Sequence, residues 1–314
     1  MVKRFFIFLL VLVFSFSVFA IKIGVTTITL RHAFFQAINA GIIDAANKLE
    51  DVEVIVFDPD LSLEKQINAM EDFIVEGVDG IILIAVDNYA LIPVVEEAAK
   101  KKIPVITVDA PVKTDAVTTF IGTENYNAGY ELGLVAKEYI NKNLNGSATI
   151  AIVRWLESQV QIDRTEGFKE ALKDMKNVTF VGEYQGYDRD ESFKSVSDLL
   201  VSNPDIDIIF APAENSVVGA HAALETMNRL DVKIFGFDMT EEAIRGIKDG
   251  SIVAMVQQQP YLEGIVAVQS VMIKLKGEKE LGSNWLPSKR FVPVIIYTQE
   301  NIDEYKTNPT SPSK

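Results

Sequence analysis

Apolar and polar positions along this 314-residue chain follow two periods, one typical of strands and one typical of helices. Residues 81–85 are a continuous apolar run, as in a strand covered on both faces. Residues 34–49 instead place Ala37, Ile38 and Ile42 on one helical face. The alternation predicts an α/β fold of parallel sheets with right-handed crossovers. The expected strands are 21–27, 52–57, 81–85, 104–108, 118–121, 149–154, 178–185, 206–211, 232–237, 253–257 and 292–297, and the expected helices are 34–49, 62–76, 91–102, 127–141, 164–175, 190–201, 217–229, 240–249 and 261–276.

One β-α-β unit occurs twice, in residues 77–111 and 204–239. Each copy has an acidic start, an apolar strand, a polar turn, a helical stretch and a second strand that ends in Asp. Asp79 and Asp109 are 30 residues apart, and Asp207 and Asp238 are 31 residues apart. The repeat predicts two doubly wound parallel-sheet lobes, each with a carboxylate at the carboxyl end of a strand.

The two ends of the chain are predicted to lie outside this fold. Lys3 and Arg4 precede an apolar run of about 15 residues that ends at Val18-Phe19-Ala20, a pattern typical of a secretory signal peptide. The alternative is a membrane anchor, but the run is shorter than the ~20 residues that span a bilayer. We expect residues 1–20 to be a signal peptide cleaved near Ala20, which indicates a periplasmic or extracellular protein. The Pro- and Ser-rich residues 307–314 are expected to be disordered.

Composition excludes several classes of function. Without Lys3 and Arg4 the chain has 28 basic and 44 acidic residues, so nucleic acid is a poor partner. There is no cysteine, which removes disulfides, thiolate nucleophiles and cysteine metal sites. Phosphate-binding glycine motifs, HExxH and GxSxG are also absent from the sequence. We therefore expect no catalytic residue, no cofactor and no metal.

The loops after the predicted strands carry the candidate binding residues, because ligands of such sheets bind beyond the strand carboxyl ends. Carboxylates, amides and arginine bind hydroxyls, and aromatic rings stack on the apolar faces of sugar rings. Two alternatives stay open: Asp109 and Asp238 could cap helices, and Phe34 and Phe35 could be core. Arg164 stands at a predicted helix start, where a cation opposes the helix dipole and therefore suggests a functional role. The candidates are His32, Phe34, Phe35, Asp109, Trp155, Arg164, Tyr187, Glu214, Asp238 and Gln258.

Several motifs, in order, resemble the periplasmic sugar-binding proteins of ABC transporters, the type I group that binds ribose, glucose or xylose. The resemblance covers essentially the whole mature chain. It rests on the Phe34-Phe35 doublet and on EGVDGIIL, IPVITVDA, IGTENYNAGYELG, DRTEGF, FGFDMT and QQP at residues 76–83, 103–110, 121–133, 163–168, 235–240 and 258–260.

The resemblance implies roles for individual residues. Phe34 and Phe35 match stacking aromatics, and Asp109 and Asp238 match hydroxyl acceptors from opposite lobes. Arg164 and Gln258 match polar ligand contacts, and Tyr187 lies where an aromatic often covers the second face of the sugar. Ala85, Ala110, Ala213 and His32 depart from the ribose binders, which argues for a bulkier or differently hydroxylated ligand.

The resemblance also implies a hinge of three segments, near residues 123–124, 258–259 and 289–290. The first lobe would contain residues 21–123 and 259–288, and the second lobe residues 124–258 and 289–306. We expect a monomer that closes on a hexose or pentose and delivers it to an ABC permease. A binder of a cyclic polyol such as inositol and a sugar sensor subunit stay open, whereas a glycosidase and a repressor are disfavoured.

Overall fold

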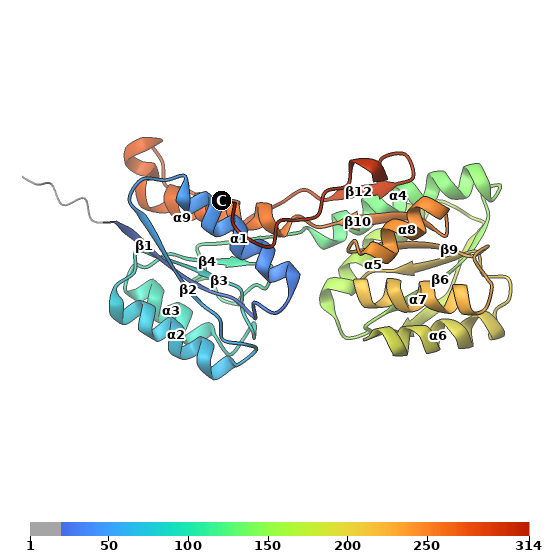
Figure 1. Cartoon of the computed structure of the whole chain (residues 1–314), viewed down its shortest axis with the longest axis horizontal. Helices are drawn as coiled ribbons and strands as arrows, with labels where there is room; N and C mark the ends of the chain where they lie inside the picture. Colours follow the sequence, from blue (N-terminus) through green and yellow to red (C-terminus); the bar gives the residue numbers. More distant parts are fainter. Residues whose placement is uncertain (1–19, 314) are drawn as a thin grey trace, which may run out of the picture.

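The chain forms two α/β lobes side by side, as a computed structural model that describes residues 20–313 shows (Figure 1). The predicted signal peptide lies outside the described residues except for Ala20. Each lobe has a central sheet with helices on both faces, as the alternating pattern predicted. Among the described residues, no helix is both long and apolar enough to cross a membrane.

The first lobe is assembled from most of the N-terminal third of the chain and a later segment. Helices α1 and α9 pack on one face of its sheet, and α2 and α3 pack on the other. Its elements are β1 (Ile21–Thr26), α1 (Ala33–Asn47), β2 (Val52–Phe57), α2 (Leu63–Glu76), β3 (Gly80–Leu83), α3 (Ile92–Lys100), β4 (Val105–Val108), β5 (Thr119–Gly122), α9 (Pro260–Glu280) and β11 (Lys289–Phe291).

The second lobe repeats this plan. Helices α4 and α5 cover one face of its sheet, and α6, α7 and α8 cover the other. Its elements are α4 (Asn125–Asn143), β6 (Ala148–Arg154), α5 (Gln159–Leu172), β7 (Val178–Gln185), α6 (Arg189–Ser202), β8 (Ile208–Ala211), α7 (Glu214–Thr226), β9 (Lys233–Phe237), α8 (Glu241–Asp249), β10 (Ile252–Gln257), β12 (Ile295–Thr298) and a short 3-10 helix (Ile302–Glu304).

The two six-stranded sheets have equivalent strand orders, β11-β5-β4-β3-β1-β2 and β12-β10-β9-β8-β6-β7. The last five strands of the two orders correspond and run parallel in both sheets, whereas the first strands, β11 and β12, differ. Strand β11 runs parallel to β5, whereas β12 runs antiparallel to β10. The strands that follow the acidic starts, β3 and β8, are buried along their whole length, which explains their continuous apolar sequence.

Matched glycine pairs bring two helices together in each lobe. An added methyl group on Gly41 would meet the Tyr261 carbonyl oxygen at 2.0 Å, and one on Gly264 would meet the Ile38 carbonyl oxygen at 2.1 Å. The second lobe has the same arrangement: Gly129 faces the Arg164 carbonyl oxygen at 2.0 Å and Gly167 faces the Tyr126 carbonyl oxygen at 1.9 Å. Only glycine permits this approach, so α1 with α9 is the equivalent of α5 with α4.

Polar side chains fix where several helices begin. The Ser62 hydroxyl accepts a hydrogen bond from the Lys65 amide at 3.3 Å, which confirms Ser62 as the N-cap of α2. Ser158 caps α5 in the same way and starts that helix at Gln159. The sequence placed this start at Arg164, which was wrong because the capping serine lies six residues upstream.

The third crossing between the lobes lies later than the sequence suggested. Residues 289–291 pair with β5 in the first sheet, although the sequence analysis assigned them to the second lobe. The strand expected at 292–297 begins later, as β12 at Ile295, and residues 292–294 connect β11 in the first sheet to β12 in the second. The other two crossings, after β5 and after β10, lie at the expected positions.

The C-terminal tail returns to the first lobe and contacts it. The Ser313 amide donates to both carboxylate oxygens of Asp44 on α1, at 2.8 and 3.0 Å. Asn308 donates through its side chain to the Gln258 carbonyl oxygen at 3.3 Å. Residues 307–313 have no regular secondary structure, and these two hydrogen bonds are made at their ends; the disorder expected for the tail stays a prediction.

Candidate functional site

Asp109 and Asp238 occupy equivalent positions at the carboxyl ends of β4 and β9. Both have left-handed backbone angles, with φ of 58° and 70°. The Asp109 amide donates to the Ile121 carbonyl oxygen and the Asp238 amide to that of Val256, each at 2.8 Å. Left-handed conformations are more accessible to Asp and Asn than to most residues. Neither aspartate caps a helix, since no helix follows Asp109 directly and Thr240 is the N-cap of α8.

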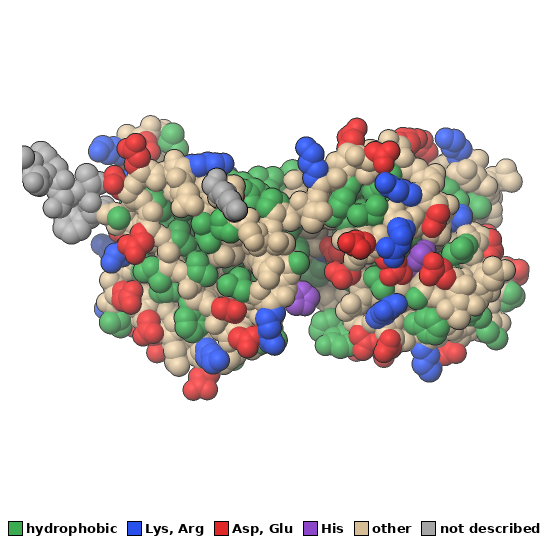
Figure 2. Space-filling view, in the orientation of Figure 1, with side chains coloured by type: hydrophobic (Ala, Val, Ile, Leu, Met, Phe, Trp, Pro, Cys, Tyr) green, Lys and Arg blue, Asp and Glu red, His purple; other side chains and the backbone are tan. Residues whose placement is uncertain are grey.

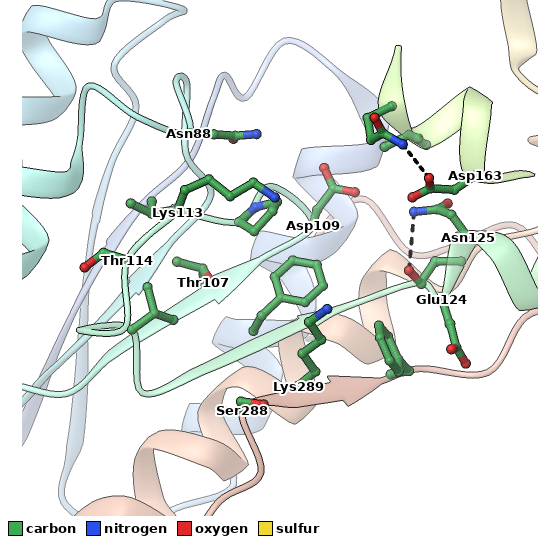
Figure 3. Close-up of a pocket in the computed structure, with 18 of the residues that line it drawn as sticks. Asn88, Thr107, Asp109, Lys113, Thr114, Glu124, Asn125, Asp163, Ser288 and Lys289 are labelled. Atoms are coloured by element: carbon green, nitrogen blue, oxygen red, sulfur yellow. Dashed lines mark hydrogen bonds between the residues drawn. The ribbon is translucent and has the colours of Figure 1, made fainter.

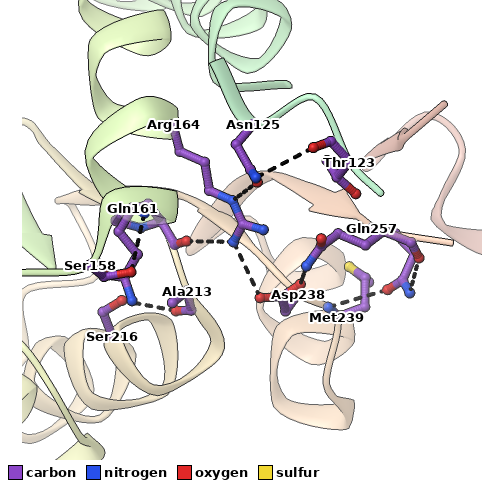
Figure 4. Close-up of polar contacts among 12 residues, drawn as sticks. Thr123, Asn125, Ser158, Gln161, Arg164, Ala213, Ser216, Asp238, Met239 and Gln257 are labelled. Atoms are coloured by element: carbon purple, nitrogen blue, oxygen red, sulfur yellow. Dashed lines mark hydrogen bonds and ion pairs between the residues drawn. The ribbon is translucent and has the colours of Figure 1, made fainter. Parts of the chain in front are cut away.

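Asp238 is held by two side chains from distant parts of the chain (Figure 4). Gln258, next to the second crossing, donates from Nε2 to Asp238 Oδ1 at 2.7 Å. The Arg164 guanidinium lies 3.6 Å from Asp238 Oδ2. One carboxylate oxygen therefore faces an amide and the other faces a cation, which keeps the charged group in one orientation.

Arg164 is itself fixed and almost wholly buried, with 4% of its surface exposed. It donates from Nε to Asn125 Oδ1 and from Nη1 to the Pro212 carbonyl oxygen, both at 2.9 Å. Its guanidinium lies 4.3 Å from the centre of the Phe237 ring. Because α5 begins at Gln159, Arg164 is not at a helix N-terminus, and the argument from the helix dipole was wrong. The carboxylates and carbonyl around it account for its position.

Asp109 lies in the first lobe without side-chain partners like those that hold Asp238. Burial raises its pKa to about 6, with Arg164 opposing the shift and Asp238 adding to it. The two aspartates and Arg164 therefore interact electrostatically although they come from different lobes. No side-chain hydrogen bond to Asp109 occurs within residues 20–313.

A cleft of about 1280 Å³ lies between the lobes beside Asp109 (Figure 3). Its wall combines the loop after β4, the first crossing and the start of α5. Asn88, Asp109, Glu124, Asn125 and Asp163 are among its polar residues. Figure 2 shows the two lobes meeting at a narrow waist, with acidic and basic side chains interspersed on this face.

The predicted aromatic residues form two pairs, one on each lobe. Phe34 and Phe35 meet edge to face, with ring centres 5.6 Å apart, and both are half-buried against the core of the first lobe. Trp155 and Tyr187 also meet edge to face, at 5.0 Å, and remain 38% and 56% exposed. The core alternative therefore holds in part for the phenylalanines, whereas the second pair leaves ring surface open to solvent.

His32 and Glu214 complete the predicted set. His32 is exposed and immediately precedes α1, and Glu214 is the first residue of α7. Burial and Asp238 raise the pKa of Glu214, and His32 opposes this shift. Since His32 belongs to the first lobe and Glu214 to the second, this interaction also joins the lobes.

Sequence reasoning missed Glu263 and Asn125. Glu263, in the first turn of α9, is fully buried, and neither of its carboxylate oxygens has a hydrogen-bond partner. Burial and Asp109 raise its pKa well above the usual value, and Arg164 only partly opposes this. In the sequence, Glu263 is the only charged residue in the segment PYLEGI at 260–265, and this was the one sign that it could be buried. Asn125 belongs to the motif IGTENYNAGYELG at residues 121–133, which was used for the family resemblance and not as a source of binding residues.

Comparisons with known proteins agree with this architecture. The family model described as a periplasmic binding protein domain matches residues 23–279. The ribose import binding protein RbsB of Bacillus subtilis is 29% identical over 258 residues, which are 82% of each chain. A solute binding protein of Bacillus halodurans with bound myo-inositol has 27% identity and a TM-score of 0.74 over 91% of this chain and 97% of its own.

A second structure supports the fold alone. The sugar-binding protein of a sugar ABC transporter from Bacillus halodurans has a TM-score of 0.82 at 24% identity and covers 91% of this chain and all of its own. The relatives are substrate-binding proteins of ABC transporters and not enzymes. Since the family model spans most of the chain, this protein belongs to the periplasmic binding protein family.

Proposed function

We propose that this protein binds a monosaccharide or a cyclic polyol outside the cytoplasm and delivers it to an ABC permease. The observation that carries the proposal is the matched placement of Asp109 and Asp238 on opposite lobes, with Arg164 close to both. A neutral polyol offers hydroxyl donors to the two carboxylates and acceptors to the guanidinium. Each hydrogen bond to a charged group contributes about 1.5–3 kcal/mol, so a few of them give tight binding.

Hinge closure would bring the two halves of this site onto one ligand. Three crossings join the lobes, and the cleft beside Asp109 is wide for a single sugar ring. Closure is favoured only by contacts that the ligand makes in the closed form. In that form Phe34 and Phe35 would cover one face of the ring, and Trp155 or Tyr187 the other.

The remaining residues support a ligand other than ribose. Ala85 and Ala110 lack the polar side chains that the resemblance to ribose binders would place in the first lobe, and His32 adds a donor. The relatives include a protein named for ribose import and one with bound myo-inositol, and hexoses and pentoses are both compatible with the site. Export with cleavage near Ala20, a monomeric state and contact with permease subunits belong to the same proposal.

Thermal unfolding with a panel of pentoses, hexoses and inositols tests the proposal. A ligand at 100 times its dissociation constant should stabilise the free protein by ~2.7 kcal/mol. Asp109→Asn and Asp238→Asn should each weaken binding of that ligand about 10- to 100-fold, because each removes a charged acceptor. Asparagine tolerates the left-handed backbone, so the variants should still fold.

Asp51→Asn is the matched control, since Asp51 also has a left-handed φ, of 63°, but is exposed at a turn away from the cleft. It should leave the affinity unchanged. A panel without a stabilising sugar or polyol would contradict the proposal. Release of product from an aryl glycoside would instead favour a glycosidase with Asp109 and Asp238 as its carboxylate pair.

A further inference from the structure

A histidine and two glutamates meet on the second lobe, outside the cleft. His221 and Glu225 are one turn apart on α7, and Glu242 comes from the first turn of α8. One ligand atom from each of the three lies within 4.8 Å of the others. His221 is buried, with 3% of its surface exposed, whereas Glu225 reaches the solvent. None of the three belongs to the proposed sugar site.

The hydrogen bonds around Ser251 determine which nitrogen of His221 carries a proton. The Ser251 hydroxyl has one hydrogen, and it donates this to Asp249 Oδ1 at 2.6 Å, a length typical of a bond to a carboxylate. The Ser251 oxygen therefore accepts from His221 Nε2, which lies 2.8 Å away. In the neutral imidazole the proton is on Nε2, and the lone pair of Nδ1 remains available.

That lone pair faces another acceptor. His221 Nδ1 lies 3.2 Å from Glu242 Oε1. Two acceptors at this distance repel each other unless a proton or a cation lies between them. A bond from a protonated imidazole to a carboxylate is usually about 2.7–2.9 Å long. Two ligands of one tetrahedral zinc ion, at ~2.0–2.1 Å from the metal, are instead separated by roughly 3.3–3.4 Å.

We propose that His221, Glu242 and Glu225 form a site for a zinc-type transition-metal ion on the second lobe. Nδ1 of His221 and one carboxylate oxygen from each glutamate would supply three ligands, and water would supply the fourth. The Asp249-Ser251 pair fixes the tautomer and orientation of the ring, as partners of metal-bound histidines usually do. No metal was expected from the sequence, because it contains no cysteine and no HExxH motif.

The geometry also explains the choice of ion. Imidazole with two carboxylates suits zinc, whereas calcium and magnesium prefer oxygen ligands alone. Glu225 is exposed and can rotate onto an ion without disturbing the buried ring. Binding there would link α7 to α8 and should stabilise the second lobe.

Zinc titration of protein purified without a polyhistidine tag and treated with chelator tests this inference. Competition with a chromophoric chelator should give one site per chain, and zinc should raise the unfolding temperature. Glu225→Gln and Glu242→Gln should each weaken zinc binding at least tenfold. Glu241→Gln, the exposed neighbour at the same helix start, should leave zinc affinity unchanged.

Failure to bind zinc, or equal affinity in all of these variants, would overturn the proposal. Loss of affinity in Glu241→Gln as large as in Glu242→Gln would overturn it too, because it would indicate nonspecific attraction to acidic side chains. Stronger binding of calcium than zinc would contradict the assigned role of the imidazole. Glu225→Gln keeps the test valid if Glu242→Gln folds poorly, since the Glu225 side chain is exposed whereas that of Glu242 contacts the buried His221.

Discussion

The two strand-end aspartates share a backbone and differ in their surroundings. Asp109 and Asp238 have nearly the same φ and the same amide bond to the neighbouring strand. Asp238 is held by Gln258 and faces Arg164, whereas Asp109 lies in a setting that raises its pKa to about 6. The repeated fold therefore reproduces the position of a carboxylate but not its chemistry.

The matched glycine pairs and the backbone hydrogen bonds of the two aspartates show why Asp109 and Asp238 have different surroundings. By these equivalences, Ile38 on α1 corresponds to Arg164 on α5. Thr123, two residues after the acceptor of the Asp109 amide, corresponds to Gln258, two residues after the acceptor of the Asp238 amide. Ile38 is a core residue with none of its surface exposed, and Thr123 is too short to reach as Gln258 does. One lobe thus presents a carboxylate that two side chains already orient, and the other presents one without a side-chain hydrogen bond among the described residues.

Among the changes that test the different surroundings of the two aspartates, loss of Arg164 should lower the stability of the protein most. Arg164→Gln would leave Asp238 without its cation and the Pro212 carbonyl and Asn125 without a donor. Breaking a buried ion pair by removing one partner costs about 3–5 kcal/mol, and the partial exposure of Asp238 favours the lower end. We expect a loss of about 3 kcal/mol in the free energy of unfolding, measured by urea denaturation without ligand.

Arg31→Gln is the control for that experiment. Arg31 pairs with Asp60 at 2.6 Å, but both side chains are at least half exposed. Exposed pairs contribute about 0–1 kcal/mol, so this variant should change stability little. Equal losses of stability in Arg164→Gln and Arg31→Gln would show that the ion pair of Arg164 with Asp238 contributes no more than an exposed ion pair.

Substitutions in the two glycine-containing helix pairs should lower stability less than loss of Arg164 does. Their effects on ligand binding should differ between the two lobes. Gly129→Ala pushes α4 away from the backbone of Arg164, and Gly264→Ala pushes α9 away from that of Ile38. Overpacking costs about 1–3 kcal/mol, so each variant should lose about 2 kcal/mol of stability. Only Gly129→Ala displaces Arg164 directly, so it should weaken ligand binding more than Gly264→Ala does.

Chemical denaturation and ligand titration of the two variants measure both effects. Glu138→Ala, on the exposed face of α4, provides the control for a change in helix propensity. Equal affinities in both glycine variants would argue against a special role for the second lobe in orienting its carboxylate.

The titration of Asp109 should give the smallest of the expected changes in stability, and it should be visible in the pH dependence of unfolding. The pKa of Asp109 rises from 3.8 to about 6 on folding, so between these values the folded protein binds more protons than the unfolded chain. Stability should therefore fall as the pH rises from 4 to 6 and should level off above 6. A pKa shift of one unit corresponds to ~1.4 kcal/mol, and solvent near this half-buried group reduces the total to roughly 1–2 kcal/mol.

Asp109→Asn removes the group that titrates. The stability of the native chain relative to this variant should drop across pH 4–6, as measured by urea denaturation at each pH. Asp51→Asn should give no such difference curve relative to the native chain. A difference curve with the opposite slope would mean that Asp109 is stabilised as a carboxylate in the free protein.

Local sequence patterns were sufficient for the fold class and for the positions of the two strand-end aspartates. Buried strands read as apolar runs, helices showed their own period, and Asp109 and Asp238 ended strands in both copies of the repeat. Errors arose where a boundary depends on a single bond, as with the Ser158 cap of α5. Glu263 was missed because no periodicity distinguishes a glutamate on a surface from one that is fully buried.

By itself the sequence determined the alternation of elements, the two lobes and the carboxylates at their strand ends, because each depends on neighbouring residues. Tertiary structure decided the pairing of residues 289–291 with the first sheet and the return of the tail to Asp44. It also decided which aspartate meets Gln258 and Arg164. These outcomes depend on contacts between segments far apart in the chain, and their free energies follow from burial and distance that no local pattern records.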